Sequence, residues 1–375
     1  MDISFKFDPE ILIGADTLSM AGTVAGRHGN RIMIAADHGL DTQTTGRLKE
    51  ILQDSGIEAI VFDGIEEETP VDTAENIVEL SSAAHCDAII GFGGRKTQII
   101  ARMAAIMAPM KIKAFELLDG RAPEKYLPLI AIPTEGLDAF SLTEFFIAAD
   151  PRNRLIKSIQ SPGSLYAAVI IDSGLLKFLS GAAASFFLLD GYLSAIEAYC
   201  STRANFLSDA LLERGLNFYT RLFKSGAEGM SADIYAQASF LTSLGSSVSS
   251  PGAGAALSYA VNARSQASKQ QCSAALLPLI AEKLVSARPE KMSRVASFLG
   301  SAGKATSVAD AANSALDGIR RCMAALKAPS DLKEFNIPLD KVTTAVSTAR
   351  NLEFVANSPW TVTEEAVFEI IKKII

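Results

Sequence analysis

The sequence predicts an α/β domain followed by an all-helical domain, and three observations support this fold class. Strand-like and helix-like segments alternate through the first half of the chain, which is typical of βαβ units and a mostly parallel sheet. The strand-like runs are continuously apolar, as expected of a sheet that is covered on both faces. From about Leu175 onward these runs disappear, and Ala-, Leu- and Ser-rich stretches with helical spacing replace them.

The elements of the first half follow from these patterns in order. We expect strands at 31–36, 58–62, 87–92, 127–132 and 167–171, and helices at 40–55, 73–84 and 96–107. The change of pattern gives an α/β domain of residues 1–178, for which the glycine-rich segment 91–97 predicts nucleotide binding, and an all-helical domain of residues 179–375, with a cleft between them. Near the C-terminus, Thr361 and Glu364 match a capping box, so we expect Thr361 to be the N-cap of the last helix.

Composition excludes several classes of function. The chain has 375 residues, of which 49% are hydrophobic and 21% charged, as in ordinary globular enzymes. Its net charge of −7 provides no excess of cations, so we expect neither a nucleic-acid partner nor a membrane-bound form. The N-terminus lacks the features of a signal peptide, and the four cysteines are far apart. We therefore expect a cytoplasmic protein with reduced thiols.

The segment Gly91–Thr97 is a candidate phosphate-binding turn between a strand and a helix. Glycines let the backbone approach a phosphate, and the start of a helix offers free N–H groups and a positive dipole end. Arg95 and Lys96 add charge, although the segment matches neither the P-loop nor the G-x-G-x-x-G pattern. A tight structural turn is the alternative.

Asp37 lies at the end of an early strand. Its carboxylate is suited to accept hydrogen bonds from the ribose hydroxyls of NAD. The alternative is an ordinary N-cap or loop aspartate.

Several further segments, taken in order, carry a resemblance to a known family. They are 87–94, similar to the start of G-G-G-S-x-x-D-x-x-K; Pro133-Thr134, the start of P-T-T-x-G-T-G-S-E; 190–199, similar to D-A-x-x-H-A-x-E-A-Y; 276–278, the end of H-G-x-x-N-A-x-L-L-P; and 357–365, similar to N-P-R-x-x-T-x-E-D. The chain thereby resembles the iron-containing alcohol dehydrogenases, which are related to glycerol dehydrogenase and dehydroquinate synthase. The resemblance implies a dehydroquinate synthase-like fold with a Rossmann-like sheet, and a homodimer or larger oligomer.

The resemblance also implies an NAD(H) or NADP(H) cofactor. The residues that would hold it are Asp37, Gly93, Gly94, Arg95, Lys96, Thr134 and Lys157. Asp37 favours NAD, because a carboxylate would repel the 2′-phosphate of NADP. The chain departs from the family at this site: Arg95 and Lys96 replace the third glycine and the serine of the glycine motif, and Glu135–Phe140 replaces the polar core of the P-T-T stretch.

The metal-binding residues of the family are mostly replaced. Relatives hold iron or zinc with one acidic residue and two or three histidines, and the ion polarises the substrate oxygen. Asp190 retains the acid, whereas Ser194, Ala255 and Lys269 stand at the histidine positions. The chain has three histidines, all in its first half: His28, His38 and His85. Because a tight iron or zinc site needs nitrogen or sulfur ligands, Asp190 alone is not expected to hold the ion as relatives do.

Lys269 suggests what replaces the ion. We expect its ammonium to pair with Asp190 and to take the place of the metal, because an ammonium donates a hydrogen bond to a carbonyl and stabilises developing negative charge. A purely structural ion pair or a solvated lysine is the alternative. Tyr259 stands close by, where the family often has a histidine that is not a ligand.

Three functions follow from these expectations. The first is an NAD(P)-dependent oxidoreductase that acts on a small alcohol or aldehyde, with Asp190 and Lys269 facing the substrate. The second is a catalytically silent relative that binds a nucleotide or another phosphorylated ligand. The third is a lyase of the dehydroquinate synthase kind, which the missing metal ligands disfavour.

Overall fold

The computed structural model describes residues 5–65, 70–176, 182–226, 229–303 and 305–375. These fall into two compact units, which are described separately below. The first unit comprises Met1–Gly136, Glu144–Pro151 and Ser158–Phe178, and the second comprises Leu137–Thr143, Arg152–Lys157 and Leu179–Ile375. The expected boundary between residues 178 and 179 lies outside the described residues.

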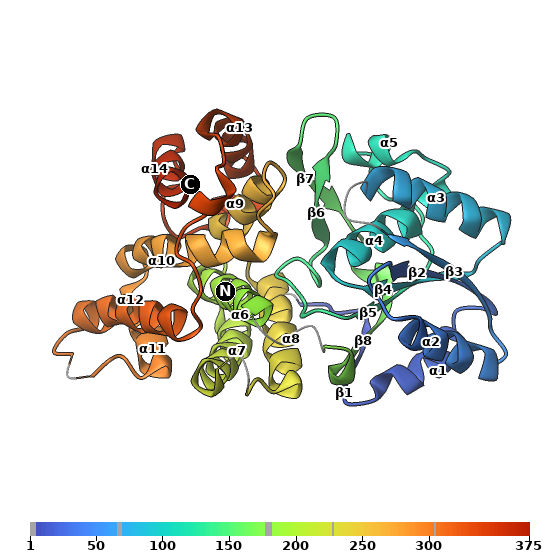
Figure 1. Cartoon of the computed structure of the whole chain (residues 1–375), viewed down its shortest axis with the longest axis horizontal. Helices are drawn as coiled ribbons and strands as arrows, with labels where there is room; N and C mark the ends of the chain where they lie inside the picture. The colour runs from blue at the N-terminus through green and yellow to red at the C-terminus, as the bar shows by residue number, and fades with distance from the viewer. Residues whose placement is uncertain (1–4, 66–69, 177–181, 227–228, 304) are drawn as a thin grey trace. The chain divides into compact units, whose positions relative to one another are not determined.

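The first unit is built on a six-stranded parallel sheet. Its strands lie in the order β1-β8-β5-β4-β2-β3. Their bounds are β1 Glu10–Gly14, β2 Arg31–Asp37, β3 Glu58–Ile65, β4 Ala88–Gly93, β5 Leu129–Pro133 and β8 Tyr166–Asp172. Because all six strands are parallel, their carboxyl ends meet at one edge of the sheet (Figure 1). That edge carries most of the candidate cofactor residues.

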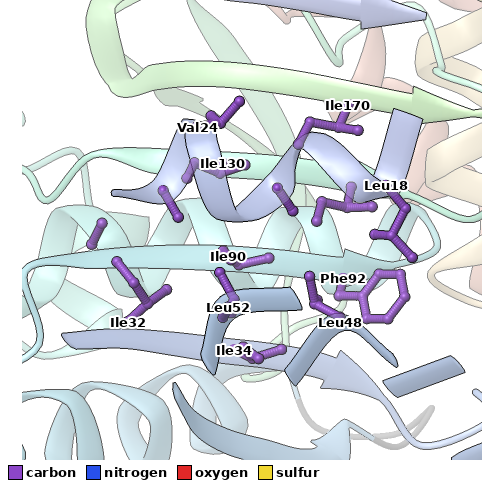
Figure 2. Packing of buried hydrophobic residues seen from close by; sticks show 14 of the residues in the cluster. Leu18, Val24, Ile32, Ile34, Leu48, Leu52, Ile90, Phe92, Ile130 and Ile170 are labelled. Carbon is purple, nitrogen blue, oxygen red and sulfur yellow. The ribbon is translucent and has the colours of Figure 1, made fainter. Parts of the chain in front are cut away.

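The apolar runs of the strands produce the core of this unit. Alternate residues of a strand face the same side of a sheet, so Ile32 and Ile34 of β2 lie beside Ile90 of β4 and pack against the helical segments on that side (Figure 2). The helical partners include Leu48 and Leu52 of α2. All five side chains are fully buried, and burial of each contributes roughly 1.5–3 kcal/mol.

Helices cover both faces of this sheet. They are η1 Thr17–Met20, α1 Ala21–Ala25, α2 Thr42–Asp54, α3 Pro70–Ala83, α4 Arg95–Met110 and α5 Ala114–Leu118. The segments η1, α1 and α2 pack on the face described above, whereas α4 packs on the other face, where a Cβ placed on Gly91 would lie 2.9 Å from the Cβ of Ala101. The expected alternation of strands and helices is confirmed.

Three strands of the first half, and the short helices η1, α1 and α5, were not predicted. The edge strand β1 pairs with β8, and β6 (Phe145–Asp150) and β7 (Leu155–Gln160) form a separate two-stranded sheet. The other five strands of the main sheet and the helices α2, α3 and α4 overlap the predicted segments, with ends that differ by a few residues.

The second unit is helical throughout its described residues after β8, as the sequence predicts. Its helices are α6 Ala182–Cys200, α7 Phe206–Ser225, α8 Ala232–Val248, α9 Ala253–Asn262, α10 Lys269–Ala287, α11 Pro289–Leu299, α12 Val308–Ala325, α13 Leu339–Arg350 and α14 Glu364–Ile374. The most apolar of them, α6, contacts α7, α8, α9 and α10 (Figure 1). An apolar surface all around a helix is typical of a helix enclosed by others, and α6 therefore forms the centre of this unit. None of the helices in the described ranges combines the length and the apolar character needed to cross a bilayer.

The last helix corrects the prediction of its N-cap. Thr363, not Thr361, precedes α14, and its hydroxyl accepts a hydrogen bond from the Ala366 N–H at 3.1 Å. Both threonines lie just before the same apolar residues at helical spacing. The capping-box pattern therefore placed the start of the helix two residues too early. The expected apolar face is present, because Val367, Ile370, Ile371 and Ile374 are buried.

Candidate functional site

The turn between β4 and α4 has the strand–glycine–helix geometry that the sequence predicts. β4 ends at Gly93, Gly94 is the N-cap of α4, and Arg95 is the first helical residue. Gly93 has φ +157°, and a Cβ at this position would lie 2.7 Å from Thr97 Oγ1 and 2.8 Å from Asp37 Cβ. A side chain does not fit there, so the glycine is required by the close packing of the turn.

Two carboxylates of the protein occupy the start of α4. The Gly94 N–H donates a hydrogen bond to Asp37 Oδ2 at 3.3 Å, and the Arg95 N–H donates one to Glu135 Oε2 at 3.1 Å. Asp37 ends β2 and Glu135 follows β5, which are the two neighbours of β4 in the sheet. The N-terminus of a helix attracts anions through its free N–H groups and its dipole, and here the anions are side chains of the same chain.

The structure brings most of the predicted cofactor residues to this edge of the sheet. Arg95 and Lys96 lie half-buried in the first turn of α4, and Thr134 is buried with its N–H donating to the Gly93 carbonyl at 3.1 Å. Asp37 is the partner of Gly94 and is not the N-cap of α2, which is Asp41. Lys157 lies on β7 in the part of the chain assigned to the second unit. The roles of these residues toward a cofactor stay predictions.

Sequence reasoning missed Glu135 as part of this site. The replaced P-T-T stretch indicated that something differs here, but it did not show where the new carboxylate lies. In the arrangement observed, this carboxylate occupies the Arg95 N–H at the start of α4.

The second candidate site lies within the helical unit and centres on a buried ion pair. Lys269 is the first residue of α10, and its Nζ lies 2.5 Å from Asp190 Oδ1 on α6. Lys269 is 0% exposed and the Asp190 side chain 9% exposed, so the lysine is not solvated. A capping box fixes the start of α10: Ser268 Oγ accepts from the Gln271 N–H, and Gln271 Oε1 accepts from the Ser268 N–H. The expected pairing of the two residues is present.

An aromatic ring and a second carboxylate adjoin this pair. The ring centroid of Tyr259 lies 5.3 Å from Lys269 Nζ, within the range of a cation–π interaction. The Tyr259 hydroxyl donates a hydrogen bond to Asp138 Oδ2, and Asp138 Oδ1 accepts from the Phe140 N–H at 2.8 Å. Sequence reasoning placed Tyr259 near the site by its family position, and it missed Asp138.

Glu197 positions the helix that carries Tyr259. Its carboxylate accepts hydrogen bonds from the N–H groups of Gly254 at 2.6 Å and Ala255 at 2.9 Å, at the start of α9. A Cβ on Gly252 would lie 2.5 Å from this carboxyl group, so the helix start needs a glycine there. Burial raises the pKa of Glu197 to about 7, although the two N–H donors and the charge of Lys269 act in the opposite direction.

The residues around Asp190 do not fit the family's metal. Ser194 is buried one turn further along α6, and Ala255 presents its backbone N–H to Glu197. Within the described part of the chain, no group of three or more histidine, cysteine, aspartate or glutamate residues is arranged to hold a metal ion. The Lys269 ammonium takes the position beside Asp190 Oδ1 that a cation would need. The donors are therefore those of an ammonium–carboxylate pair and not those of an iron or zinc centre.

Comparison with known proteins agrees with the fold and identifies relatives. Residues 8–173 match the family model described as iron-containing alcohol dehydrogenase, and residues 188–375 match the model of the C-terminal domain of that family. The chain is 24% identical over 321 residues to 1,3-propanediol dehydrogenase of Citrobacter freundii, covering 82% of each protein. It is 25% identical over 303 residues to choline dehydrogenase of Bacillus subtilis, covering 78% of this chain and 75% of that protein.

Solved structures have the same fold. A 1,3-propanediol oxidoreductase superposes with a TM-score of 0.91 at 21% identity, and 100% of each chain is covered. Sulfoacetaldehyde reductase of Bifidobacterium kashiwanohense, solved in complex with NAD+, superposes with a TM-score of 0.84 at 16% identity over 100% of this chain and 99% of that one. Since both family models match and together span most of the sequence, the chain belongs to the iron-containing alcohol dehydrogenase family of oxidoreductases.

Proposed function

We propose that this chain is an NAD(P)-dependent oxidoreductase for a small alcohol or aldehyde, in which the Lys269–Asp190 pair stands in place of the metal ion. Membership of an oxidoreductase family supports the reaction class. Relatives whose names specify 1,3-propanediol, choline and sulfoacetaldehyde support a small substrate. The observation that carries the proposal is the fully buried ammonium, which lies beside the one acid that the family's metal site retains here.

The pair is suited to bind a substrate oxygen. An ammonium has three N–H donors, and within the described part of the chain Asp190 is the hydrogen-bond acceptor of Lys269. The other donors can bind a carbonyl oxygen, and the alkoxide that develops when the carbonyl is reduced, once substrate binding opens access to the ammonium, which is fully buried in this structure. Asp190 compensates the charge of the lysine and fixes its direction, and the Tyr259 ring bounds the ammonium on another side.

This role differs from that of a metal in strength and in geometry. An ammonium is a point charge that donates hydrogen bonds, whereas a divalent ion is a Lewis acid that accepts a lone pair. We therefore expect a reaction that depends on a proton donor at the substrate oxygen and that continues in the presence of a chelator.

The test compares variants of two lysines that are each paired with an aspartate in the helical unit. NADH and NADPH oxidation is measured with a panel of small aldehydes for the wild type, Lys269→Met and Lys291→Met, after metal analysis and with EDTA present. Lys291 pairs with Asp209 at 2.6 Å and serves as the control. We expect Lys269→Met to lower kcat about 10²–10³-fold, as the loss of an oxyanion donor does, and Lys291→Met to change it little. Loss of wild-type activity in EDTA, or an unchanged rate in Lys269→Met, would refute the proposal.

A second candidate is a catalytically silent relative that binds a phosphorylated ligand. The carboxylates of Asp37 and Glu135 at the start of α4 favour it, because they occupy N–H groups that a cofactor phosphate would use. Ligand binding without turnover of any alcohol or aldehyde in the panel would support this alternative. A homodimer in the cytoplasm is part of either proposal, and sedimentation measurements test the dimer.

A further inference from the structure

We propose that Glu135 sets the affinity of the cofactor site, because its carboxylate competes with a cofactor phosphate for the N-terminus of α4. This inference rests on the proposed nucleotide cofactor. It adds to that proposal an internal competitor that must leave before a phosphate can bind.

The contact of Glu135 resembles that of a bound anion. Its Oε2 accepts a hydrogen bond from the Arg95 N–H at 3.1 Å. A Cβ built on Gly94 would lie 2.6 Å from Glu135 Oε1 and 3.1 Å from Oε2, so the carboxylate rests directly on the backbone of the glycine turn. Close approach of an anion to glycine backbone, with N–H donors of a helix start beside it, is the arrangement that phosphate-binding turns use.

Asp37 adds a second negative charge at the same place. Its Oδ2 accepts from the Gly94 N–H, so two consecutive N–H groups of the turn face two carboxylates. A phosphate that approaches the turn meets this negative charge and finds the N–H donors occupied. Neutral hydroxyl side chains would leave the donors and the dipole available to the phosphate.

Glu135 is the carboxylate that can leave. Asp37 is the last residue of β2 and is held by the pairing of that strand with its neighbours. Glu135 lies beyond the end of β5, its side chain is half-buried, and Gly136 follows it. Rotation of its long side chain would release the Arg95 N–H, together with the other contacts of this carboxylate, without breaking the sheet.

The experiment measures binding of NADH and of inorganic pyrophosphate to the full-length chain by calorimetry. The variants are Glu135→Gln, which removes the charge and keeps an oxygen that accepts from Arg95, and Glu135→Ala, which also frees the N–H. Glu75→Gln is the matched control, because Glu75 Oε1 accepts from the Ala114 N–H at the start of α5 at 3.1 Å. We expect both Glu135 variants to bind pyrophosphate and NADH at least tenfold more tightly than the wild type, and Glu75→Gln to bind them as the wild type does.

The outcomes separate this inference from the proposed function. Equal dissociation constants for NADH in all four proteins would overturn the role of Glu135 and leave the cofactor proposal standing. Tighter pyrophosphate binding in the Glu135 variants, with no NADH binding in any protein, would support the role of Glu135 and remove the dinucleotide from the proposed function. Absence of pyrophosphate and NADH binding in every variant would overturn the inference. Circular dichroism confirms that each variant is folded.

Discussion

Breaking the Lys269–Asp190 pair on one side should destabilise the protein far more than replacing both partners. We expect Lys269→Met to lower the free energy of unfolding by about 3–5 kcal/mol, which is typical when one partner of a buried ion pair is removed. The reason is that the Asp190 carboxylate then stays buried, with 9% of its side chain exposed, without a compensating charge. Replacing both residues by apolar ones removes this penalty.

The distance between the two groups sets the scale of the effect. At 2.5 Å the gross attraction is about 7 kcal/mol for an effective dielectric constant of ~20. Desolvation costs several kcal/mol for each ion, so the intact pair contributes little net stability. The cation–π contact with Tyr259 adds roughly 1–2 kcal/mol on the side of the lysine. The coupling between the partners should therefore be large even though their combined contribution is small.

A double-mutant cycle measured by urea unfolding tests this reasoning. The cycle comprises the wild type, Lys269→Met, Asp190→Leu and the double variant. We expect a coupling energy of at least about 2 kcal/mol, within the range found for residues in direct contact. The partly exposed Lys291–Asp209 pair provides the control, with a coupling of about 1 kcal/mol or less. Additive losses at Lys269 and Asp190, within about 0.5 kcal/mol, would refute the assignment of a tightly coupled buried pair.

Two further predictions concern helix starts in the second unit. Burial raises the pKa of Glu197 from 4.5 to about 7, so the folded state binds more protons than the unfolded state between these values, and stability should fall as the pH rises through this window. Glu197→Gln should remove that part of the slope in urea unfolding between pH 4.5 and 7, whereas an unchanged slope would contradict the assignment. Thr363→Ala should cost about 1 kcal/mol through loss of the cap of α14, and Thr361→Ala should cost little. Equal losses in thermal unfolding would restore Thr361 as the cap.

The parallel sheet could be predicted because its central strands are apolar on both faces. β4 is buried at every position and β2 is buried between its end residues, and such continuously apolar runs of strand length are typical of a parallel sheet between two layers of helices. The edge strand β1 was missed because it is half-exposed over five residues and lacks this continuous burial. The hairpin strands β6 and β7 mix buried with partly exposed or exposed residues and form their own small sheet, so their pattern does not match the rule that revealed the main sheet.

The candidate sites could be predicted where a match to a family motif indicates which residues lie near each other in the fold. The family resemblance places Lys269 and Asp190 at metal-binding positions, so opposite charges there were expected to pair, and they do. The contacts of Glu135 and Asp138 were not predictable, because they depend on where the chain leads after β5. A departure from a motif shows where the contacts of a site can differ, whereas the new partner of a side chain is seen only in the structure.

The replacements in the two units follow the same electrostatic logic. Where the family places a cation beside Asp190, this chain supplies the ammonium of Lys269. Where an anionic phosphate is expected at α4, the chain supplies the carboxylate of Glu135.

The two replacing side chains differ in how readily they can move away from their sites. Lys269 is fully buried and begins a capped helix, so the position of its side chain is fixed. Glu135 is a half-buried side chain beyond a strand end, so its negative charge can withdraw. A fixed ammonium with a displaceable carboxylate is the combination that the proposed oxidoreductase needs, since the proposed substrate-binding group stays in place while the proposed cofactor site opens.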